Sequence, residues 1–341
     1  MIDVNASFTR RPALPFPWLV ADIGGTFARF GLVLGDGSET QGGIRHVRKL
    51  PVASFADPAK AAQAYFADMA AALGAGFSAP RAAAFAVASP LDGDRVELLN
   101  AHWSFSRAAV QAELDLDAFI VLNDFEALAL SLPRLDATQL RAHKALPQPQ
   151  GTLAVIGPGT GLGVAGVVET PGGWTALPTE GGHATLAAAD DFESALLAHV
   201  RREYAHVSAE RLLSGIGMPV LYGAVAHLLG APAEELNTES IVERGMNGGD
   251  PVCGRTLDVF CALLGGFAGN VALTLGARGG VYIGGGIVPR LGERFFASQF
   301  RERFEAKGRF RGYLEEIPTA LITDTLAALT GAAAAIDQYA A

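Results

Sequence analysis

The sequence predicts an α/β protein built from two similar domains, and three observations support this. Segments typical of buried strands alternate with segments typical of helices. The chain has 341 residues, enough for two domains with sizeable cores. A strand, a glycine-rich turn and a second strand open the chain at 18–34, and this pattern recurs at 152–168. The separation of the two turns is far too long for a solenoid repeat and suits a pair of domains.

The first domain is expected over residues 18–133, after an N-terminal extension at 1–17 that prolines interrupt. Pro133 and the stretch "ALPQPQG" at 145–151 favour a change of domain between them. Apolar runs rich in β-branched residues predict its strands, and helical spacing of apolar residues predicts its helices. The strands are predicted at 18–23, 27–34, 43–50, 82–88, 94–99 and 118–122, and the helices at 57–74, 104–114 and 124–132.

The second domain is expected over residues 134–323 and becomes mainly helical after its glycine turn. Helical spacing of apolar residues continues through most of this half, with glycines and prolines between the segments. Helices are predicted at 190–204, 208–213, 217–229, 238–246 and 251–276, a short strand within 279–289, a last strand at 319–323 and an Ala-rich helix at 325–338.

Composition excludes several classes of partner. The formal net charge is −9, with 26 basic and 35 acidic residues and no basic run, so nucleic acid is not expected to bind. Cys253 and Cys261 form no CxxC or Cys/His cluster, which argues against a zinc site and favours a reducing compartment. No long apolar stretch follows the N-terminus, so we expect neither a signal peptide nor a membrane span, and a cytoplasmic protein.

The stretch "LVADIGGTFARFGLV" at 19–33 places Asp22, Gly24, Gly25 and Thr26 in a tight turn between two strands. Glycines allow a ligand to approach the backbone, and successive N–H groups in such a turn can bind an anion. The alternative is a hairpin whose glycines serve turn geometry alone. Asp22 favours the anion site, because a carboxylate beside a phosphate is useful when Mg²⁺ lies between them.

A second glycine turn, "GPGTGLG" at 157–163, strengthens the phosphate interpretation, because two such turns could hold one polyphosphate from two sides. Residues 161–166 also match GxGxxG, the dinucleotide fingerprint. That fingerprint requires a following helix, whereas "VAGVVETPGGW" is β-branched and then turns, so we reject a Rossmann site. The sequence contains no GxxxxGK[ST] and is therefore not a P-loop protein.

A polar pair opens a predicted helix in "IVLNDFEALAL" at 120–130, where Asn123 and Asp124 follow a strand. Helix capping by Asn or Asp would explain the pair. The functional alternative is that the strand end displays a carboxylate and an amide, which can bind a polyol and remove a proton from one hydroxyl.

Two further segments carry polar residues that suit hydroxyl groups. "PTEGGHATL" at 178–186 holds Glu180 and His183 around two glycines, and "HVSAERLLSGIG" at 206–217 holds Glu210. A carboxylate and an imidazole are good partners for a sugar hydroxyl. Each of these residues could instead be an ordinary surface residue, and Glu210 could belong to a solvated helical face. "GGGIVP" at 284–289 could form a sharp strand-to-helix turn or a platform for a purine, and the sequence leaves both open.

Taken together, these segments resemble bacterial glucokinases of the zinc-free, enterobacterial-type hexokinase group. The resemblance runs from about residue 18 to the C-terminus and rests on motifs that occur in the family's order. They are DIGGT at 22–26, LNDF at 122–125, GTGLGV at 159–164, EGGH at 180–183, HVSAERLLSG at 206–215, GGVYIGGGIVP at 279–289 and KGRF at 307–310.

The resemblance implies the actin-like ATPase (ribonuclease H-like) fold, with two α/β domains flanking a cleft. The smaller domain would be completed by the C-terminal helix at 324–341. The resemblance also implies phosphorylation of glucose at its 6-hydroxyl by ATP with Mg²⁺, the entry step of glycolysis, by a homodimer. Such a phosphoryl transfer needs mainly positioning and charge neutralisation.

The family's functional residues carry over onto matching positions of this chain. Asp124 corresponds to the catalytic base, and Asp22 is placed to hold Mg²⁺ through its water shell. The sugar ligands that the resemblance implies are Asn123, Asp124, Glu180, His183 and Glu210. The nucleotide and phosphate ligands that it implies, beside Asp22, are Gly24, Gly25, Thr26, Gly159, Thr160, Gly284, Gly285 and Gly286.

Two alternatives stay open at this point. One is a kinase of the same fold with another substrate, such as a different hexose or an N-acetyl sugar, although the EGGH and SAER segments favour an unsubstituted hexose. The other is a non-catalytic sugar-binding regulator. The chain departs from the family pattern at Thr179, where a glycine is usual before EGGH.

Overall fold

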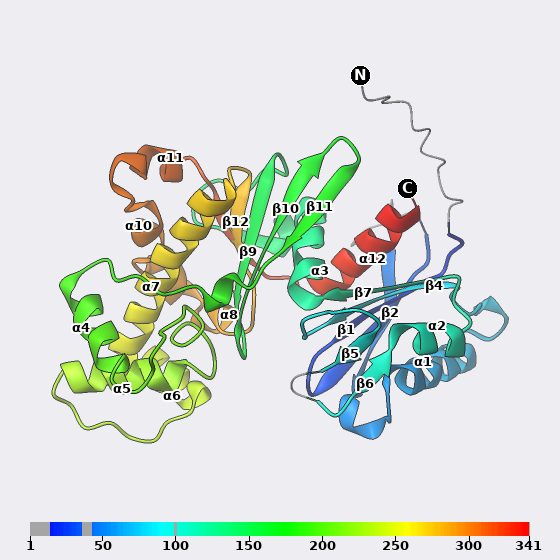
Figure 1. The fold of residues 1–341 in the computed structure, drawn as a ribbon, viewed down its shortest axis with the longest axis horizontal. Helices are drawn as coiled ribbons and strands as arrows, with labels where there is room; N and C mark the ends of the chain where they lie inside the picture. Colours follow the sequence, from blue (N-terminus) through cyan, green and yellow to red (C-terminus); the bar gives the residue numbers. More distant parts are fainter. Residues whose placement is uncertain (1–13, 36–42, 99–100, 341) are drawn as a thin grey trace. The chain divides into compact units, whose positions relative to one another are not determined.

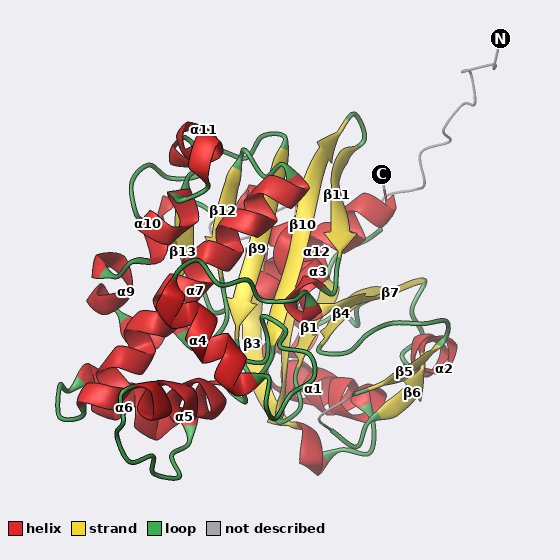
Figure 2. Cartoon of the chain, turned by 60° about the vertical axis from the view of Figure 1, so that its left-hand side comes forward, coloured by secondary structure: helices red, strands yellow, loops and turns green. Residues whose placement is uncertain are grey.

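The computed structural model describes residues 14–35, 43–98 and 101–340, so the predicted extension at 1–17 falls mostly outside the described residues. The chain divides into two compact units, one formed by residues 1–134 and 326–341 and the other by residues 135–325. Each is a mixed α/β unit around its own sheet, and the predicted α/β class is confirmed (Figure 2).

Unit 1 is built on a five-stranded sheet in the order β3-β2-β1-β4-β7. Its first three strands form antiparallel pairs, whereas β1, β4 and β7 run parallel. The strands are β1 (Trp18–Ile23), β2 (Phe27–Val33), β3 (Ile44–Pro51), β4 (Ala82–Val87) and β7 (Ala118–Asn123), with a small pair β5 (Arg95–Glu97) and β6 (Ser104–Ser106). The helices are α1 (Pro58–Leu73), α2 (Arg107–Glu113), α3 (Asp124–Ser131) and α12 (Ala327–Ala340).

The last helix of the chain returns to unit 1 and packs against α3 (Figure 1). The two backbones approach so closely that a Cβ added at Gly331 would lie 1.6 Å from the carbonyl oxygen of Ala127. The predicted helix at 325–338 therefore forms as α12, and a glycine at one position fixes how closely it packs.

We expect Gly331→Ala to lower the free energy of unfolding by about 1–3 kcal/mol, because the added methyl forces the two helices apart. Gly266→Ala is the matched control, since a Cβ at this helical glycine meets nothing within 4 Å. Thermal melting of both variants checks the difference, and equal melting temperatures would contradict the packing role of Gly331.

Unit 2 repeats the same strand order around the second glycine turn, with one strand added: β11-β10-β9-β12-β13-β8. The strands are β8 (Leu140–Ala142), β9 (Thr152–Pro158), β10 (Leu162–Thr170), β11 (Gly173–Pro178), β12 (Gly280–Ile283) and β13 (Thr319–Ile322). The helices are α4 (Asp191–Val200), α5 (Met218–Leu228), α6 (Thr238–Met246), α7 (Pro251–Leu275), α8 (Val288–Leu291), α9 (Glu293–Ala297), α10 (Phe300–Glu305) and α11 (Arg311–Glu315).

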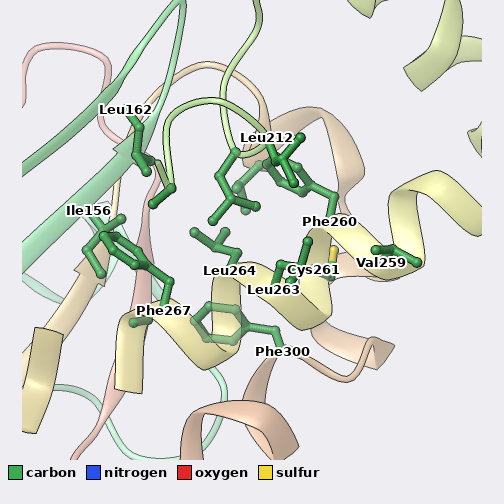
Figure 3. Close-up of a cluster of buried hydrophobic side chains, with 14 of the residues drawn as sticks. Ile156, Leu162, Leu212, Val259, Phe260, Cys261, Leu263, Leu264, Phe267 and Phe300 are labelled. Atoms are coloured by element: carbon green, nitrogen blue, oxygen red, sulfur yellow. The ribbon is translucent and has the colours of Figure 1, made fainter. Parts of the chain in front are cut away.

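Helix α7 is the centre of the core of unit 2. It is long and apolar enough to cross a membrane, yet 78% of its most apolar window is buried inside the protein, as in a core helix. Figure 3 shows Phe260, Leu263, Leu264 and Phe267 of α7 in one buried cluster that includes Ile156 of β9.

Two predicted elements differ from the structure, and other elements were not predicted. The helix predicted at 104–114 begins only at Arg107, because Ser106 caps it by accepting the Ala109 N–H at 3.1 Å and residues 104–106 form β6. Residues 208–213 form turns and not a helix, because the Ala209 and Glu210 N–H groups donate to the carbonyls of Ala184 and Gly182 in a neighbouring loop. The strands β8 and β11 were not predicted at all, since neither has a strong apolar alternation.

Candidate active site

The first glycine turn joins β1 and β2 in unit 1, as predicted. The Gly24 N–H donates to the carbonyl of Phe27 at 3.0 Å, and the Thr26 carbonyl accepts the Val52 N–H at 3.0 Å. Turn geometry does not explain the glycines, because neither Gly24 nor Gly25 has a positive φ. Packing does not require Gly24 either, since an added Cβ would make only an ordinary contact at 3.7 Å. Glycine here leaves room for a ligand to approach the backbone of the turn closely, at the half-buried Gly25 and the exposed Thr26.

Asp22 lies beside this turn and faces a cation that the sequence analysis missed. Arg29 of β2 is its direct cross-strand neighbour, and the Arg29 Nη1 lies 3.3 Å from Asp22 Oδ2. Burial raises the pKa of Asp22, and the positive charge of Arg29 counteracts part of that rise. The hairpin register could have revealed Arg29, because a tight turn at 24–26 pairs position 22 with position 29.

Asn123 and Asp124 emerge at the same sheet edge as Asp22. Strands β1, β4 and β7 are parallel and in register, with Val87 beside both Ile23 and Asn123, so their carboxyl ends lie together. Residues that follow these three strands therefore share one edge of the sheet, the edge where open α/β sheets bind ligands.

The side chain of Asn123 caps α3, which leaves Asp124 available for another role. Asn123 Oδ1 accepts the Phe125 N–H at 2.9 Å, and its Nδ2 donates to the Ser89 carbonyl at 3.3 Å. Asp124 Oδ1 lies 3.0 Å from the same Phe125 N–H. Burial, and secondarily the negative charge of Asp22, raise the pKa of Asp124 to about 6. A carboxylate with such a pKa is well suited to accept a proton near neutral pH.

If Asp124 acts as a general base, its pKa predicts an acid limb in the pH dependence of kcat/KM. The base must be ionised to act, so kcat/KM should fall about tenfold per pH unit below pH 6 and level off above it. Initial rates between pH 5 and 8 measure this, with circular dichroism at each pH to verify that the fold is intact. A profile that stays flat down to pH 5 would contradict the role of Asp124.

The second glycine turn lies between β9 and β10 in unit 2. Its Gly159 N–H donates to the Gly161 carbonyl at 2.9 Å. The carbonyls of Gly159 and Thr160 accept N–H groups of Gly215 and Ile216, at 2.7 Å and 3.3 Å. The turn therefore repeats the position of the DIGGT turn within its own sheet, and the segment at 215–216 holds it in place.

The structure also gathers Glu180, His183 and Glu210 in unit 2. Glu180 and His183 flank the short 3-10 turn Gly181–His183, in which the His183 N–H donates to the Glu180 carbonyl at 3.0 Å. The Glu210 N–H donates to the Gly182 carbonyl at 2.8 Å. Glu210 Oε1 lies 3.8 Å from His183 Nδ1, and Glu210 Oε2 accepts the Leu162 N–H at 2.8 Å. The alternative that Glu210 belongs to a solvated helical face is therefore wrong.

Thr179 shapes the loop that carries Glu180. Its hydroxyl donates to the Val164 carbonyl at 2.8 Å and accepts the Gly181 N–H at 3.1 Å. The first bond ties the loop to β10 and the second lies within the loop, so the residue that departs from the family pattern has a structural use here.

A cavity of about 580 Å³ adjoins the second glycine turn. Gly286 and Ile287 form part of its wall, which places the "GGGIVP" segment beside Gly159 and Thr160. Gly285 has φ +78°, and an added Cβ would lie 2.3 Å from the Pro158 carbonyl, so only glycine fits between the two loops. The lining residues that the sequence analysis missed are Gly215, Ile216, Pro219, Asn237, Thr238, Glu239, Ile287 and Arg290.

A magnesium ion fits the donor set of unit 1 only as a partner of bound phosphate. Across residues 14–35, 43–98 and 101–340 there is no group of three or more His, Cys, Asp or Glu residues that could hold a metal. Mg²⁺ typically takes one or two carboxylates and completes its shell with water and phosphate oxygens. Asp22, a quarter exposed beside the DIGGT turn, suits that arrangement.

Comparison with known proteins identifies the family. The glucokinase family model matches residues 19–339. A glucokinase of Aromatoleum aromaticum is 48% identical over 324 residues, 95% of each chain. The crystal structure of a glucokinase from an Antarctic psychrotroph matches with a TM-score of 0.86 and 38% identity, over 95% of this chain and 99% of that one.

A more distant structure shares the fold. A ROK family glucokinase from Streptomyces griseus, crystallised with glucose and AMPPNP, is 20% identical, with a TM-score of 0.59 over 93% of this chain and 98% of that one. The predicted actin-like ATPase fold is thereby confirmed. Since the family model and a relative 48% identical both extend over nearly all of the sequence, this chain belongs to the glucokinase family and phosphorylates glucose with ATP.

Proposed function

We propose that the reaction takes place on the 6-hydroxyl of glucose and that Asp124 is its general base. The observation that carries this proposal is the pair of carboxylates, Asp22 and Asp124, at the carboxyl edge of three parallel strands beside a ligand-accessible glycine turn. Asp124 takes the hydroxyl proton as the oxygen attacks the terminal phosphorus of ATP, and ADP leaves.

The resemblance to the family assigns each glycine turn, within its own unit, a role in binding the phosphates of the donor. Backbone N–H groups of Gly25 and Thr26 in unit 1, and of Thr160 in unit 2, donate to phosphate oxygens. The Gly24 and Gly159 N–H groups instead bond within their turns, to the Phe27 and Gly161 carbonyls, and these two residues let the phosphates approach the backbone. The nucleoside occupies the 580 Å³ cavity of unit 2, against Gly284, Gly285 and Gly286. This use of backbone donors explains how a chain of net charge −9 binds a polyphosphate.

Charge neutralisation at the phosphates comes from two sources. Asp22 would hold Mg²⁺ through the ion's water shell, and the ion would supply positive charge at the phosphate oxygens. Arg29 counteracts part of the rise in the pKa of Asp22 and brings a second positive charge to the turn. Phosphoryl transfer depends on such neutralisation more than on covalent chemistry.

The sugar is recognised through its other hydroxyls. Asn123 beside Asp124 in unit 1, and Glu180, His183 and Glu210 in unit 2, accept or donate hydrogen bonds to ring hydroxyls. Glu210 is pre-positioned for this by its bond to the Leu162 N–H. The resemblance to the family further leads us to propose a cytoplasmic homodimer.

A sugar panel tests this assignment against the alternatives. ADP release is measured with glucose, mannose, fructose and N-acetylglucosamine, with Mg²⁺ and after its removal with EDTA. We expect glucose to give the highest kcat/KM and metal removal to abolish turnover. A higher kcat/KM for N-acetylglucosamine would favour another sugar kinase, and absence of turnover with every sugar would favour a regulator.

A further inference from the structure

One segment of unit 2 touches both the proposed sugar ligands and the second glycine turn. We call residues 207–217 the strap. At its first end the strap is bonded to the loop that follows Glu180 and His183. The Val207 carbonyl accepts the Leu186 N–H at 3.0 Å, the Ala209 N–H donates to the Ala184 carbonyl at 2.9 Å, and the Glu210 N–H donates to the Gly182 carbonyl at 2.8 Å.

At its other end the strap is bonded to the phosphate turn. Gly215 and Ile216 donate their N–H groups to the carbonyls of Gly159 and Thr160, and both also line the nucleotide cavity. The Thr238 hydroxyl, at the start of α6 and in the same cavity, donates to the Gly215 carbonyl. The position of the strap therefore determines where the phosphate turn and one wall of the cavity lie.

Ser214 joins the two ends. Its side chain is completely buried, its hydroxyl donates to the Glu210 carbonyl at 2.7 Å, and it accepts the Gly217 N–H at 3.0 Å. Leu212 anchors the middle of the strap in the core, beside Phe260 and Leu264 of α7 (Figure 3). Glu210 and Gly215 are thus joined by a short bonded turn.

We propose that Ser214 is a positioning residue through which glucose binding raises the affinity for the nucleotide. Hydrogen bonds from the sugar to Glu210 fix its side chain, Ser214 transmits this order to the Gly215–Gly217 turn, and the phosphate turn is ordered in consequence. The inference rests on the proposed role of Glu210 as a sugar ligand. By linkage, the nucleotide must raise the affinity for glucose by the same factor.

Isothermal titration calorimetry tests the inference. The Kd of Mg-AMPPNP is measured without glucose and at saturating glucose, for the wild-type chain and for Ser214→Ala. We expect glucose to tighten nucleotide binding in the wild type by about 5- to 20-fold, within the usual range of coupling between sites. In Ser214→Ala the same ratio should fall to less than about twofold, while each ligand alone still binds.

Ser298→Ala is the matched control. The Ser298 hydroxyl donates to the Phe295 carbonyl at 2.7 Å and accepts the Phe300 N–H at 3.2 Å, the same pattern of bonds outside the strap. This variant should keep the wild-type ratio. The proposal would be overturned if glucose left the Kd of Mg-AMPPNP unchanged in the wild type. It would also be overturned if glucose lowered that Kd as much in Ser214→Ala as in the wild type.

Hydrogen exchange on the wild-type chain gives a second test that needs no variant. Glucose alone should slow exchange of the Gly215 and Ile216 amides severalfold, and unchanged exchange at saturating glucose overturns the proposal. Failure of the proposed sugar role of Glu210 gives a different result, because the KM for glucose would then be unchanged in Glu210→Ala.

Discussion

Asp124→Asn is expected to lower kcat for glucose phosphorylation by about 10²- to 10⁴-fold, while the KM for glucose changes only modestly. Asparagine keeps the size of the side chain and can still accept the Phe125 N–H, but it cannot take a proton from the attacking hydroxyl. Steady-state kinetics with glucose and ATP measure the effect. Turnover within tenfold of the wild type would show that another group is the base.

The same substitution should stabilise the fold, which separates lost chemistry from lost structure. The pKa of Asp124 is raised from its ordinary value of 3.8 to about 6, so folding favours the protonated form. The protonated Asp124 side chain therefore gives its full stabilising contribution below pH 3.8, and this contribution is lost as the pH rises through about 6. At pH 7 the ionised group therefore destabilises the fold by roughly 3 kcal/mol. Removing this charge should raise Tm at pH 7, and a lower Tm would contradict the burial argument.

Glu210→Ala should raise the KM for glucose by about 10²-fold or more, because a buried sugar hydroxyl loses its partner and the Leu162 N–H loses its acceptor. Glu210→Gln keeps an acceptor for that N–H and should raise KM less. Glu243→Ala, on an exposed position of α6, is the control. Unchanged KM values for glucose in both Glu210 variants would show that Glu210 does not bind sugar.

Much of this fold could be predicted because the buried strands are strongly apolar and the glycine turns recur. Strands such as Ala82–Val87 are buried at every position, so composition alone marks them. Residues 208–213 were wrongly predicted as a helix, because their apolar spacing is helical while the Ala209 and Glu210 N–H groups bond to the loop at 182–184. A sequence pattern does not record such tertiary bonds.

The candidate site was likewise predictable in part. Asp22, Asp124 and the two glycine turns could be found because strand ends and glycines are visible in the sequence. The strap and the nucleotide cavity could not, because Gly159, Gly215 and Gly286 meet only after three separate segments fold together. Arg29 could have been predicted only from the register of the hairpin, which pairs it with Asp22.

The central claim of the account is that this chain moves a phosphoryl group from ATP to the 6-hydroxyl of glucose. The most direct measurement follows glucose labelled with ¹³C at carbon 6 by NMR during reaction with ATP and Mg²⁺. The account predicts that the carbon-6 signal shifts and is split by coupling to phosphorus as glucose 6-phosphate accumulates. Consumption of ATP with an unchanged carbon-6 signal, or phosphorylation at another carbon, would contradict it.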